Sequence, residues 1–389
     1  MKYYIISGEA SGDLHGSNLI KQLHLLDATA NIRCWGGDLM KAAGATLVKH
    51  YQELAFMGFV EVIKNLPAIF KNIATCKKDI LQFKPDVLVL IDYPGFNLRI
   101  AEWAKKQGFK VVYYISPQVW AWKANRVKKM KQCIDKMLVI LPFEKQYYLD
   151  IWNWQVDYVG HPLVEVVASY QLQVASSKLA VDSAEKLTTF DSPLTRSKPI
   201  IAVLPGSRTQ EITIKLPIML NVAKHFPNHQ FVIAEAPGIE AAFYQSFYNN
   251  AVLDIANNIS TAKNNTYHLL SIATAAIVTS GTATLETALF KVPEVVCYKG
   301  SNISYQIGKR LIKIKFISLV NLIMDKLVVK ELIQNEMTTT NLVFELHDLL
   351  LNESRELQIQ QDYTELKNLL SQGGNASKKA AIIIYEFVI

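Results

Sequence analysis

The sequence predicts an α/β protein with two domains, each built on a parallel sheet. The chain has 389 residues, which is too long for one ordinary core, and half of them are hydrophobic. Short apolar runs alternate with helix-like patterns along the first half, and the alternation starts again near residue 200. Alternating strands and helices favour parallel sheets with helices on their faces. We therefore expect two Rossmann-like domains, residues 1–170 and 199–340, facing a cleft.

The strands of the first domain are predicted by apolar runs at residues 3–7, 87–91, 110–115, 137–140 and 156–159. A helical pattern of leucines follows the first of them. We expect Asn97 to cap the helix that Gly108 ends, and Pro142 to open a later helix at its first position.

A polar stretch at residues 171–198, rich in Ser, Thr and Lys, lacks clear periodicity and is expected to be a linker. The strands of the second domain are predicted at residues 200–204, 230–234 and 275–279. A helix at 211–226 is expected to be broken or kinked near Pro217. The tail at 341–389 resembles two or three helices, and the last of them is apolar enough to require a packing partner.

Composition limits the class of protein. Lysine and arginine exceed aspartate and glutamate by 41 to 34, a net charge of +7. This surplus suits an anionic substrate or a membrane surface and is too diffuse to indicate nucleic acid. The four cysteines are scattered without a CxxC pair, which favours a reducing compartment and argues against zinc. The sequence also lacks HExxH and Asp-x-Asp, so we expect no metal site and no cofactor.

Targeting signals are not evident in the sequence. The apolar run before Gly8 is too short for a signal peptide, and no segment reaches the roughly 18 uninterrupted apolar residues of a spanning helix. We therefore expect a cytoplasmic protein with at most peripheral membrane contact. Two segments are candidates for that contact: the lysine-spaced apolar stretch 56–78 and the basic stretch 123–136. A core-facing helix and a solvated helix face are the ordinary interpretations of these two segments.

Two loops of the second domain predict a diphosphate site. LPGSR at 204–208 and TSGTATLE at 279–286 each resemble a strand end that turns into a helix N-terminus. They offer backbone N–H groups, small side chains and one guanidinium, which are what a diphosphate requires. Ordinary turns are the alternative. The candidate residues are Gly206, Ser207, Arg208, Ser280, Gly281 and Thr282, with Glu286 placed to accept hydrogen bonds from ribose hydroxyls.

The segment 318–336 adds polar groups to an otherwise apolar stretch, namely Asn321, Glu331 and Gln334. With the two loops, it predicts a protein that binds a nucleotide diphosphate carrying a polyol, such as a sugar nucleotide. Because no other cation is evident near LPGSR, Arg208 is expected to carry the charge that faces the diphosphate.

Asp92 is the strongest catalytic candidate of the first domain. It ends a hydrophobic strand, at the sheet edge where open α/β folds bind ligands. Pro94 and Gly95 make the following turn rigid. A carboxylate there could take a proton from an acceptor hydroxyl. The alternative is that Asp92 caps the next helix, a role expected of Asn97.

Weaker candidates lie in three other segments of the first domain. Gly8, Ser11 and Gly12 follow the first strand and form either a ligand loop or a tight turn. In the same loop His15 could face the cleft or be a core residue. Trp120 could stack on a sugar or an acyl chain, or close a core. His161, near the domain junction, could meet the diphosphate or act as a hinge residue.

The motifs, in order, resemble a known family. GEASGD, IDYPGFN, SPQVWAW, LPFEKQYY, VGHPL, LPGSR, SGTATLE and NLIMDKLVVKELIQ are similar to those of the lipid-A-disaccharide synthases, inverting glycosyltransferases of the GT-B fold. The match runs from about Tyr4 to Glu336. One departure is Val320, where the family usually has proline before the Asn321 position.

The resemblance implies a reaction. UDP-2,3-diacylglucosamine would donate its sugar to 2,3-diacylglucosamine 1-phosphate (lipid X), giving UDP and the β-1′,6-linked lipid A disaccharide 1-phosphate. The first domain would bind the acceptor, with Asp92 as base on its 6-hydroxyl, and the second would bind the donor. Glu286 would hold the ribose. The charge on the leaving UDP would be stabilised by Arg208, Ser280, Gly281 and Thr282. The donor sugar or phosphate would be held by Asn321, Glu331 and Gln334.

The resemblance also implies that the helices at 341–389 cross back to the first domain, and that the protein works on the cytoplasmic surface of the inner membrane.

Two other functions stay open at this stage. A UDP-GlcNAc 2-epimerase-like enzyme would need no lipid acceptor site, and a non-catalytic sugar-nucleotide sensor would keep the Arg208 loop and make Asp92 dispensable. The sequence leaves homo-oligomerisation open.

Overall fold

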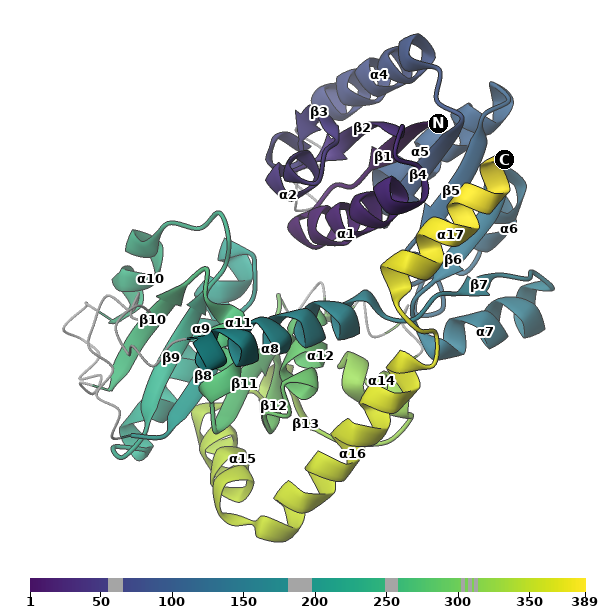
Figure 1. The fold of residues 1–389 in the computed structure, drawn as a ribbon. Helices are drawn as coiled ribbons and strands as arrows, with labels where there is room; N and C mark the ends of the chain where they lie inside the picture. The colour runs from purple at the N-terminus through teal and green to yellow at the C-terminus, as the bar shows by residue number, and fades with distance from the viewer. Residues whose placement is uncertain (55–65, 181–197, 249–257, 302–304, 307–309, 311–313) are drawn as a thin grey trace. The chain divides into compact units, whose positions relative to one another are not determined.

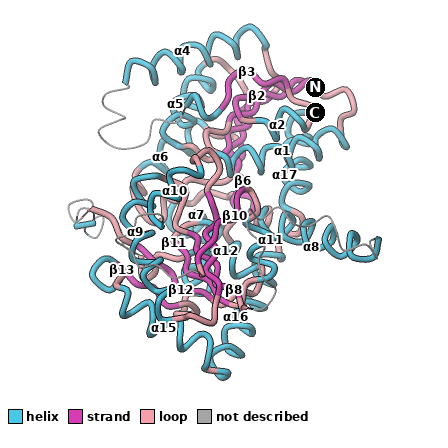
Figure 2. Tube along the Cα trace, turned by 90° about the vertical axis from the view of Figure 1, so that its left-hand side faces the viewer, coloured by secondary structure: helices cyan, strands magenta, loops and turns pink. Residues whose placement is uncertain are grey.

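The computed structural model describes residues 1–389 except 55–65, 181–197, 249–257, 302–304, 307–309 and 311–313 (Figure 1). The chain divides into two compact units. The first contains Met1–Pro162 and Leu370–Ile389, and the second contains Leu163–Leu369. Each unit has its own parallel sheet, and Figure 2 shows helices on both faces of each sheet.

Within the described residues, the sheet of the first unit has seven parallel strands in the order β3-β2-β1-β4-β5-β6-β7. Their bounds are β1 Lys2–Ile6, β2 Asn31–Gly36, β3 Thr46–His50, β4 Val87–Ile91, β5 Lys110–Tyr114, β6 Lys136–Val139 and β7 Asp157–Tyr158. Every residue of β4 is buried, because helices cover this central strand on both faces. From β1 the chain proceeds outward to β3 and then returns to β4 on the other side of β1. The strand order therefore reverses between β1 and β4.

The helices of the first unit are α1 Ala10–Leu26, α2 Asp38–Ala42, α4 Leu66–Phe83, α5 Pro94–Lys106, α6 Arg126–Cys133, α7 Pro142–Trp152 and α17 Ala376–Val388, with a 3-10 turn, η1, at Tyr51–Leu54. The C-terminal α17 packs against α1 and β5 (Figure 1). Lys110 fixes its end by donating hydrogen bonds to the carbonyl oxygens of Phe387, at 2.9 Å, and Val388, at 3.1 Å. The apolar C-terminus thus completes the first unit.

The sheet of the second unit has six parallel strands in the order β10-β9-β8-β11-β12-β13. Their bounds are β8 Ile200–Leu204, β9 Gln230–Glu235, β10 Ile259–Lys263, β11 Ala275–Thr279, β12 Glu294–Tyr298 and β13 Lys330–Ile333. Its helical elements are α8 Pro162–Ala180, α9 Thr209–Asn221, η2 Val222–His225, α10 Ala241–Tyr248, α11 Thr266–Ile272, α12 Thr282–Leu289, α14 Leu319–Met324, η3 Gln334–Glu336, α15 Thr339–Leu351 and α16 Glu353–Ser371. The strand order reverses here between β8 and β11.

Two stretches differ from what the sequence predicts. The polar residues 171–180, expected to belong to a linker, continue the helix α8, while 181–197 lie outside the described residues. The tail 341–389 was expected to pack on the first domain, yet α15 and all but the end of α16 belong to the second unit. Only α17 and the residues just before it return to the first unit, because α17 carries the apolar face that matches α1.

Candidate active site

Asp92 in the first unit and the two glycine loops in the second lie where the strand order of their sheet reverses. In the first unit β1 pairs with β4, with Ile6 opposite Leu90, so the loop at 7–9 and Asp92 leave the sheet side by side. In the second unit β8 pairs with β11, with Leu204 opposite Val278, so the loop at 205–208 lies beside the loop at 280–282. Ligands of open α/β sheets bind outside the carboxyl ends of the strands at such a reversal.

Asp92 is held by a tight and unusual backbone turn. Asp92 and Tyr93 both have left-handed backbone angles, with φ of 41° and 47°. Consecutive left-handed residues without glycine are costly and cluster at functional sites. The Asp92 N–H donates to the Tyr114 carbonyl at 3.1 Å, and the Asp92 carbonyl accepts from the Tyr113 hydroxyl at 2.5 Å. The half-buried carboxyl group contacts the turn through the Tyr93 backbone N–H, whose hydrogen bond opposes the rise in the Asp92 pKa.

Asn97 does not cap the helix after Asp92, which corrects the sequence-based expectation. Helix α5 begins three residues earlier, at Pro94, and Asn97 is buried in its first turn. Its amide donates to the carbonyl oxygens of Ile91, at 3.1 Å, and Asp92, at 2.8 Å. Asn97 therefore ties the end of β4 to α5 and stabilises the turn that presents Asp92.

Electrostatics make Asp92 a suitable general base. Burial raises the pKa of the Asp92 carboxyl to about 7, and the neighbouring Glu9 carboxylate adds to the rise. A base whose pKa lies near the working pH is ionised often enough to act and basic enough to take a proton.

Glu144 is a buried carboxyl group near Asp92 that the sequence analysis missed. It accepts hydrogen bonds from the indole N–H of Trp120 at 3.2 Å and from the backbone N–H groups of Ile140 and Leu141, at 3.3 and 3.0 Å. Burial raises the pKa of Glu144 to about 7, and the Asp92 charge contributes a smaller rise. The signal was present, because Glu144 is the third residue of α7, where a glutamate folds back on the helix start. Trp120 is therefore fixed through its nitrogen, with its ring at the edge of Phe143.

The glycines after β1 have a packing reason. A Cβ atom on Gly8 would lie 2.4 Å from the ring of Tyr93, and one on Gly12 would lie 2.9 Å from the Cβ of Ser7. These contacts favour the tight-turn interpretation of this loop. Ser11 is exposed in the first turn of α1.

His15 and His161 are buried near one another in the first unit. Burial lowers the pKa of His15 to about 4 and that of His161 to about 3, the latter with a further contribution from His15. Both rings are therefore neutral near pH 7. A neutral His161 ring could meet a phosphate only through a hydrogen bond, and its role at a diphosphate or as a hinge residue stays a prediction.

The LPGSR loop of the second unit turns at Gly206 and leads into α9. Gly206 has a φ of 115°, and a Cβ there would lie 3.6 Å from Thr279 at the end of β11 and 3.1 Å from the Glu211 carboxylate. Ser207 follows it, and Arg208 directly precedes α9. The Arg208 guanidinium is half exposed and lies 3.3 Å from the Glu211 carboxylate, with which it forms an ion pair.

Lys215 is a second cation at this loop, which corrects the expectation that Arg208 stands alone there. Its side chain is 2% exposed. Its ammonium group lies 3.4 Å from the Glu211 carboxylate and 3.6 Å from where a Cβ of Gly206 would be. Burial lowers the pKa of Lys215, and Glu211 opposes that effect. Lys215 is one turn beyond Glu211 on α9, so helical spacing from LPGSR could have found it.

In the loop at 280–282, some polar groups are exposed to solvent and others are hydrogen-bonded within the chain. Gly281, with a φ of 154°, and Thr282 are exposed at the start of α12. The Ser280 hydroxyl instead donates to the Ile317 carbonyl at 2.9 Å. Glu286 is half-buried one turn into α12 and accepts from the Tyr267 hydroxyl at 3.0 Å. Burial raises the pKa of Glu286.

The side-chain amide of Asn321 makes all its hydrogen bonds within the chain. Its amide nitrogen donates to the Val329 carbonyl at 2.8 Å and to Glu331 at 2.9 Å, while its oxygen accepts from the N–H groups of Val328 and Val329. An amide has two donor hydrogens and two acceptor positions, so none remains for a sugar. We therefore reassign Asn321 from a donor contact to a positioning residue.

Glu331 and Gln334 bind neighbouring backbone in the same way. Glu331 accepts from the N–H groups of Ile317 and Ser318 at 2.9 to 3.1 Å. Gln334 accepts from the Gly300 N–H at 2.7 Å and donates to the Gly300 carbonyl at 3.3 Å. These contacts order the segments that follow β12 and precede α14, beside the loop at 280–282. Val320, at the position where the family usually has proline, is buried within α14.

The two candidate membrane segments are described in part. Residues 56–65 lie outside the described residues, and 66–78 belong to α4, where Ile73 and Cys76 are buried in the core and Phe70 is 59% exposed. Most of the basic stretch 123–136 forms α6. Within the described part of the chain, no helix is both long and apolar enough to cross a membrane.

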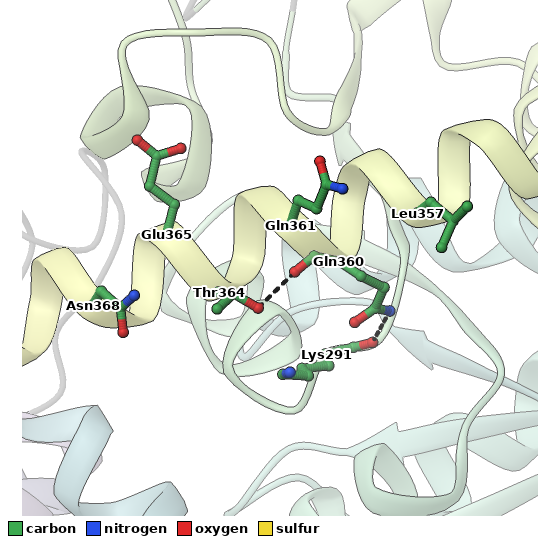
Figure 3. Close-up of a pocket in the computed structure, with 7 residues that line it drawn as sticks. All are labelled: Lys291, Leu357, Gln360, Gln361, Thr364, Glu365 and Asn368. Carbon is green, nitrogen blue, oxygen red and sulfur yellow. Dashed lines mark hydrogen bonds between the residues drawn. The ribbon is translucent and has the colours of Figure 1, made fainter.

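A shallow hollow of about 520 Å³ lies along α16 near Lys291 (Figure 3). It contains none of the predicted site residues, and its hydrogen bonds join Gln360 to the Lys291 carbonyl and Thr364 to the Gln360 carbonyl. It is therefore a surface feature of α16, separate from the strand ends. Among the described residues, no group of three or more His, Cys, Asp or Glu side chains is arranged to hold a metal ion.

Comparison with known proteins gives consistent matches along nearly the whole chain. The family model described as Lipid-A-disaccharide synthetase matches residues 3–385. A lipid-A-disaccharide synthase of Geobacter metallireducens is 36% identical over 384 residues, 98% of this chain and 96% of the relative. One of Coxiella burnetii (strain CbuG_Q212) is 36% identical over 99% of this chain and 98% of the relative.

Solved structures share the fold at low sequence identity. The UDP-GlcNAc 2-epimerase from Neisseria meningitidis bound to UDP-GlcNAc has a TM-score of 0.65 at 14% identity, and it and this chain are covered completely. CalG4, the calicheamicin glycosyltransferase, has a TM-score of 0.60 at 13% identity, with 100% of this chain and 98% of the other covered. These likenesses show the fold alone: two parallel-sheet α/β domains of the GT-B type.

Proposed function

The chain belongs to the lipid-A-disaccharide synthase family, whose members are glycosyltransferases, and on that premise we propose its substrates and the roles of its residues. The donor is UDP-2,3-diacylglucosamine. The acceptor is 2,3-diacylglucosamine 1-phosphate (lipid X), and the products are UDP and the β-1′,6-linked lipid A disaccharide 1-phosphate. The observation that supports this proposal best is Asp92, a carboxyl group with a pKa near 7 at the strand reversal of the first sheet.

The proposed step is a single displacement with inversion. The acceptor 6-hydroxyl oxygen attacks C1 of the donor sugar, and the bond from C1 to the phosphate oxygen of UDP breaks. The hydroxyl proton passes to the Asp92 carboxylate. The negative charge that develops on the leaving UDP must be met by fixed donors and cations. We assign acceptor activation to the first unit and donor binding to the second.

Donor binding in this proposal uses the loops at 205–208 and 280–282. Arg208 and the buried Lys215 supply positive charge, and the exposed start of α12 at Gly281 and Thr282 supplies backbone N–H groups. Glu286, already hydrogen-bonded to Tyr267, accepts from the ribose hydroxyls. Asn321, Glu331 and Gln334 keep the adjoining backbone in place.

Incubation of the purified protein with both lipid substrates tests the proposed reaction. We expect UDP and a lipid disaccharide in equal amounts, detected by mass spectrometry. UDP-GlcNAc supplied alone is the control, and we expect it to be unchanged. Turnover of UDP-GlcNAc to its 2-epimer, without product from the lipid pair, would favour the epimerase interpretation instead.

Removal of divalent cations should leave the reaction rate unchanged. Cations of the chain, Arg208 and Lys215, lie at the proposed diphosphate loop, so the developing charge can be offset without a bridging ion. The measurement is the initial rate of UDP release with and without excess EDTA. Loss of activity that magnesium or manganese restores would contradict this expectation.

A fraction of the protein is expected to sediment with anionic vesicles. In the cell, we expect it to bind the cytoplasmic surface of the inner membrane. The acceptor's acyl chains must reach the protein from a bilayer, and α6 carries exposed lysines such as Lys128 and Lys129. Attraction of such lysines to anionic lipid weakens with salt. Sedimentation with anionic and neutral vesicles at low and high salt measures it. Equal binding to both kinds of vesicle at every salt concentration would exclude the electrostatic contribution.

A further inference from the structure

A small hollow of about 210 Å³ lies between α5 and α6 in the first unit, beside the turn that carries Asp92. Pro94 and Gly95, the residues that follow this turn, form one part of its wall. Basic side chains of the two helices form much of the rest, namely Arg99, Arg126 and Lys129. None of the catalytic or donor-binding roles assigned above uses this hollow, although Lys129 in its lining is also one of the α6 lysines expected to attract anionic lipid.

The hollow carries positive charge that the chain does not neutralise. Glu102 is the one acidic side chain in its lining, and its carboxylate is already paired with Lys129 at 2.5 Å and with Lys106 at 3.6 Å. Arg99 donates to the Gly95 carbonyl at 3.1 Å, a neutral partner. The guanidinium of Arg126 lies 5.7 Å from the centre of the Trp122 ring, and among the described residues it has neither a hydrogen bond nor an ion pair. Arg126 is therefore a free anion-binding group at this hollow.

The hollow is electrostatically connected to Asp92. Arg126 acts on the Tyr113 hydroxyl, where it opposes the rise in the pKa of Tyr113 that burial and Asp92 cause. That hydroxyl donates directly to the Asp92 carbonyl. An anion bound at Arg126 would therefore lie within electrostatic reach of the proposed base. The 1-phosphate is on C1 and the 6-hydroxyl is on the carbon attached to C5, so the two groups flank the ring oxygen and one ring can present a group to each site.

We propose that the hollow between α5 and α6 binds the phosphate monoester of the acceptor, with the Arg126 guanidinium as its principal contact. The inference rests on the proposed function, because it takes lipid X as the acceptor. Held there by its phosphate, the acceptor sugar presents its 6-hydroxyl to Asp92. A planar guanidinium can donate two parallel hydrogen bonds to phosphate, which fixes the orientation of the sugar as well as its position.

The test compares lipid X with the same lipid from which the phosphate has been removed, both in nonionic micelles. For Arg126→Gln we expect kcat/KM toward lipid X to fall roughly ten- to a hundredfold, as for the loss of a charged hydrogen bond. Toward the dephosphorylated acceptor, kcat/KM should stay within about twofold of the unsubstituted protein, since no phosphate is there to lose. Arg126→Lys should retain part of the preference for lipid X.

Lys145→Gln is the matched control, because Lys145 is an exposed cation of α7 in the first unit that does not line the hollow and lies outside the basic stretch 123–136. It should leave the ratio of the two acceptors unchanged. An equal loss toward both acceptors in Arg126→Gln would overturn the inference. It would also be overturned if Lys145→Gln changed the ratio of the two acceptors as much as Arg126→Gln does. Thermal unfolding of each variant, at a temperature close to that of the unsubstituted protein, verifies that both units are folded. If the unsubstituted protein released no UDP with lipid X, the proposed function itself would fail, which is a different result from a variant that treats both acceptors alike.

Discussion

Replacing Asp92 with asparagine is expected to lower kcat by about 10²- to 10⁴-fold, the usual contribution of a positioned acid or base. Asparagine keeps the shape and the hydrogen-bonding capacity of the side chain but cannot accept the proton. UDP-sugar affinity should change little, because the proposed diphosphate contacts lie in the second unit, at Arg208 and Lys215. Steady-state kinetics together with direct UDP binding measure the two effects separately.

The pH dependence of the rate identifies the same group. A base must be ionised to act, and burial with the Glu9 charge raises the pKa of Asp92 to about 7. The rate of the unsubstituted protein should therefore rise with pH through about 7 and then level off. In Asp92→Asn this rise should disappear. Glu144 has a similarly raised pKa, so Glu144→Gln is the matched control and should keep the rise near pH 7.

The Asp92 substitution is not expected to unfold the protein. An ionised carboxylate is disfavoured at this half-buried position, and asparagine carries no charge, so thermal unfolding at pH 8 should occur at the same or a higher temperature. A loss of donor binding with kcat preserved would make Asp92 a positioning residue. The search for the base would then turn to Glu9 or His15.

Replacing Arg208 with alanine is the second substitution with a large expected effect. The Arg208 guanidinium is half exposed and held near the LPGSR loop by Glu211. Removal of a charge-assisted contact costs about 1.5–3 kcal/mol, which corresponds to roughly ten- to a hundredfold weaker UDP-sugar binding. Turnover should fall as well, because the charge on the leaving UDP grows in the transition state. Calorimetric titration with UDP and steady-state kinetics measure both.

Lys215 determines how complete that loss will be. It lies beneath the same loop and pairs with the same carboxylate, so some positive charge remains when Arg208 is replaced. Lys224→Ala is the control, because Lys224 is an exposed cation of the second unit that lies in η2, outside the loop. Unchanged kinetics and unchanged UDP affinity in Arg208→Ala would contradict the assignment of this loop to the donor.

The sequence predicts β4, β8 and β11 well because burial on both faces makes them continuous apolar runs, whereas β2 and β12, which also lie inside their sheets, were not predicted. The bounds of β4, β8 and β11 coincide with those predicted, and Pro142 opens α7 as expected. Edge strands such as β3 and β13 are only partly buried and mix polar with apolar residues, so hydrophobic periodicity did not reveal them.

The candidate site could be predicted where a residue follows a strand end and could not be predicted where its role depends on packing. Asp92 and the LPGSR loop were found because parallel strands place such residues at one sheet edge. In the sequence Lys215 resembles any helical lysine, and only the packing of α9 buries its side chain. Asn321 appeared available for a ligand, yet the backbone of residues 328 and 329 occupies its amide. Such contacts depend on how segments of the chain pack together in the fold, which motifs and hydrophobic periodicity in the sequence do not reveal.

The configuration of the new glycosidic bond tests the proposed mechanism most directly. The protein is incubated with α-configured UDP-2,3-diacylglucosamine and lipid X, and the linkage in the isolated disaccharide is determined by proton and carbon NMR. A single displacement at C1, with Asp92 taking the proton of the 6-hydroxyl, predicts a β-1′,6 linkage and one UDP per disaccharide. An α linkage, attachment at another hydroxyl, or UDP released without any disaccharide would contradict it.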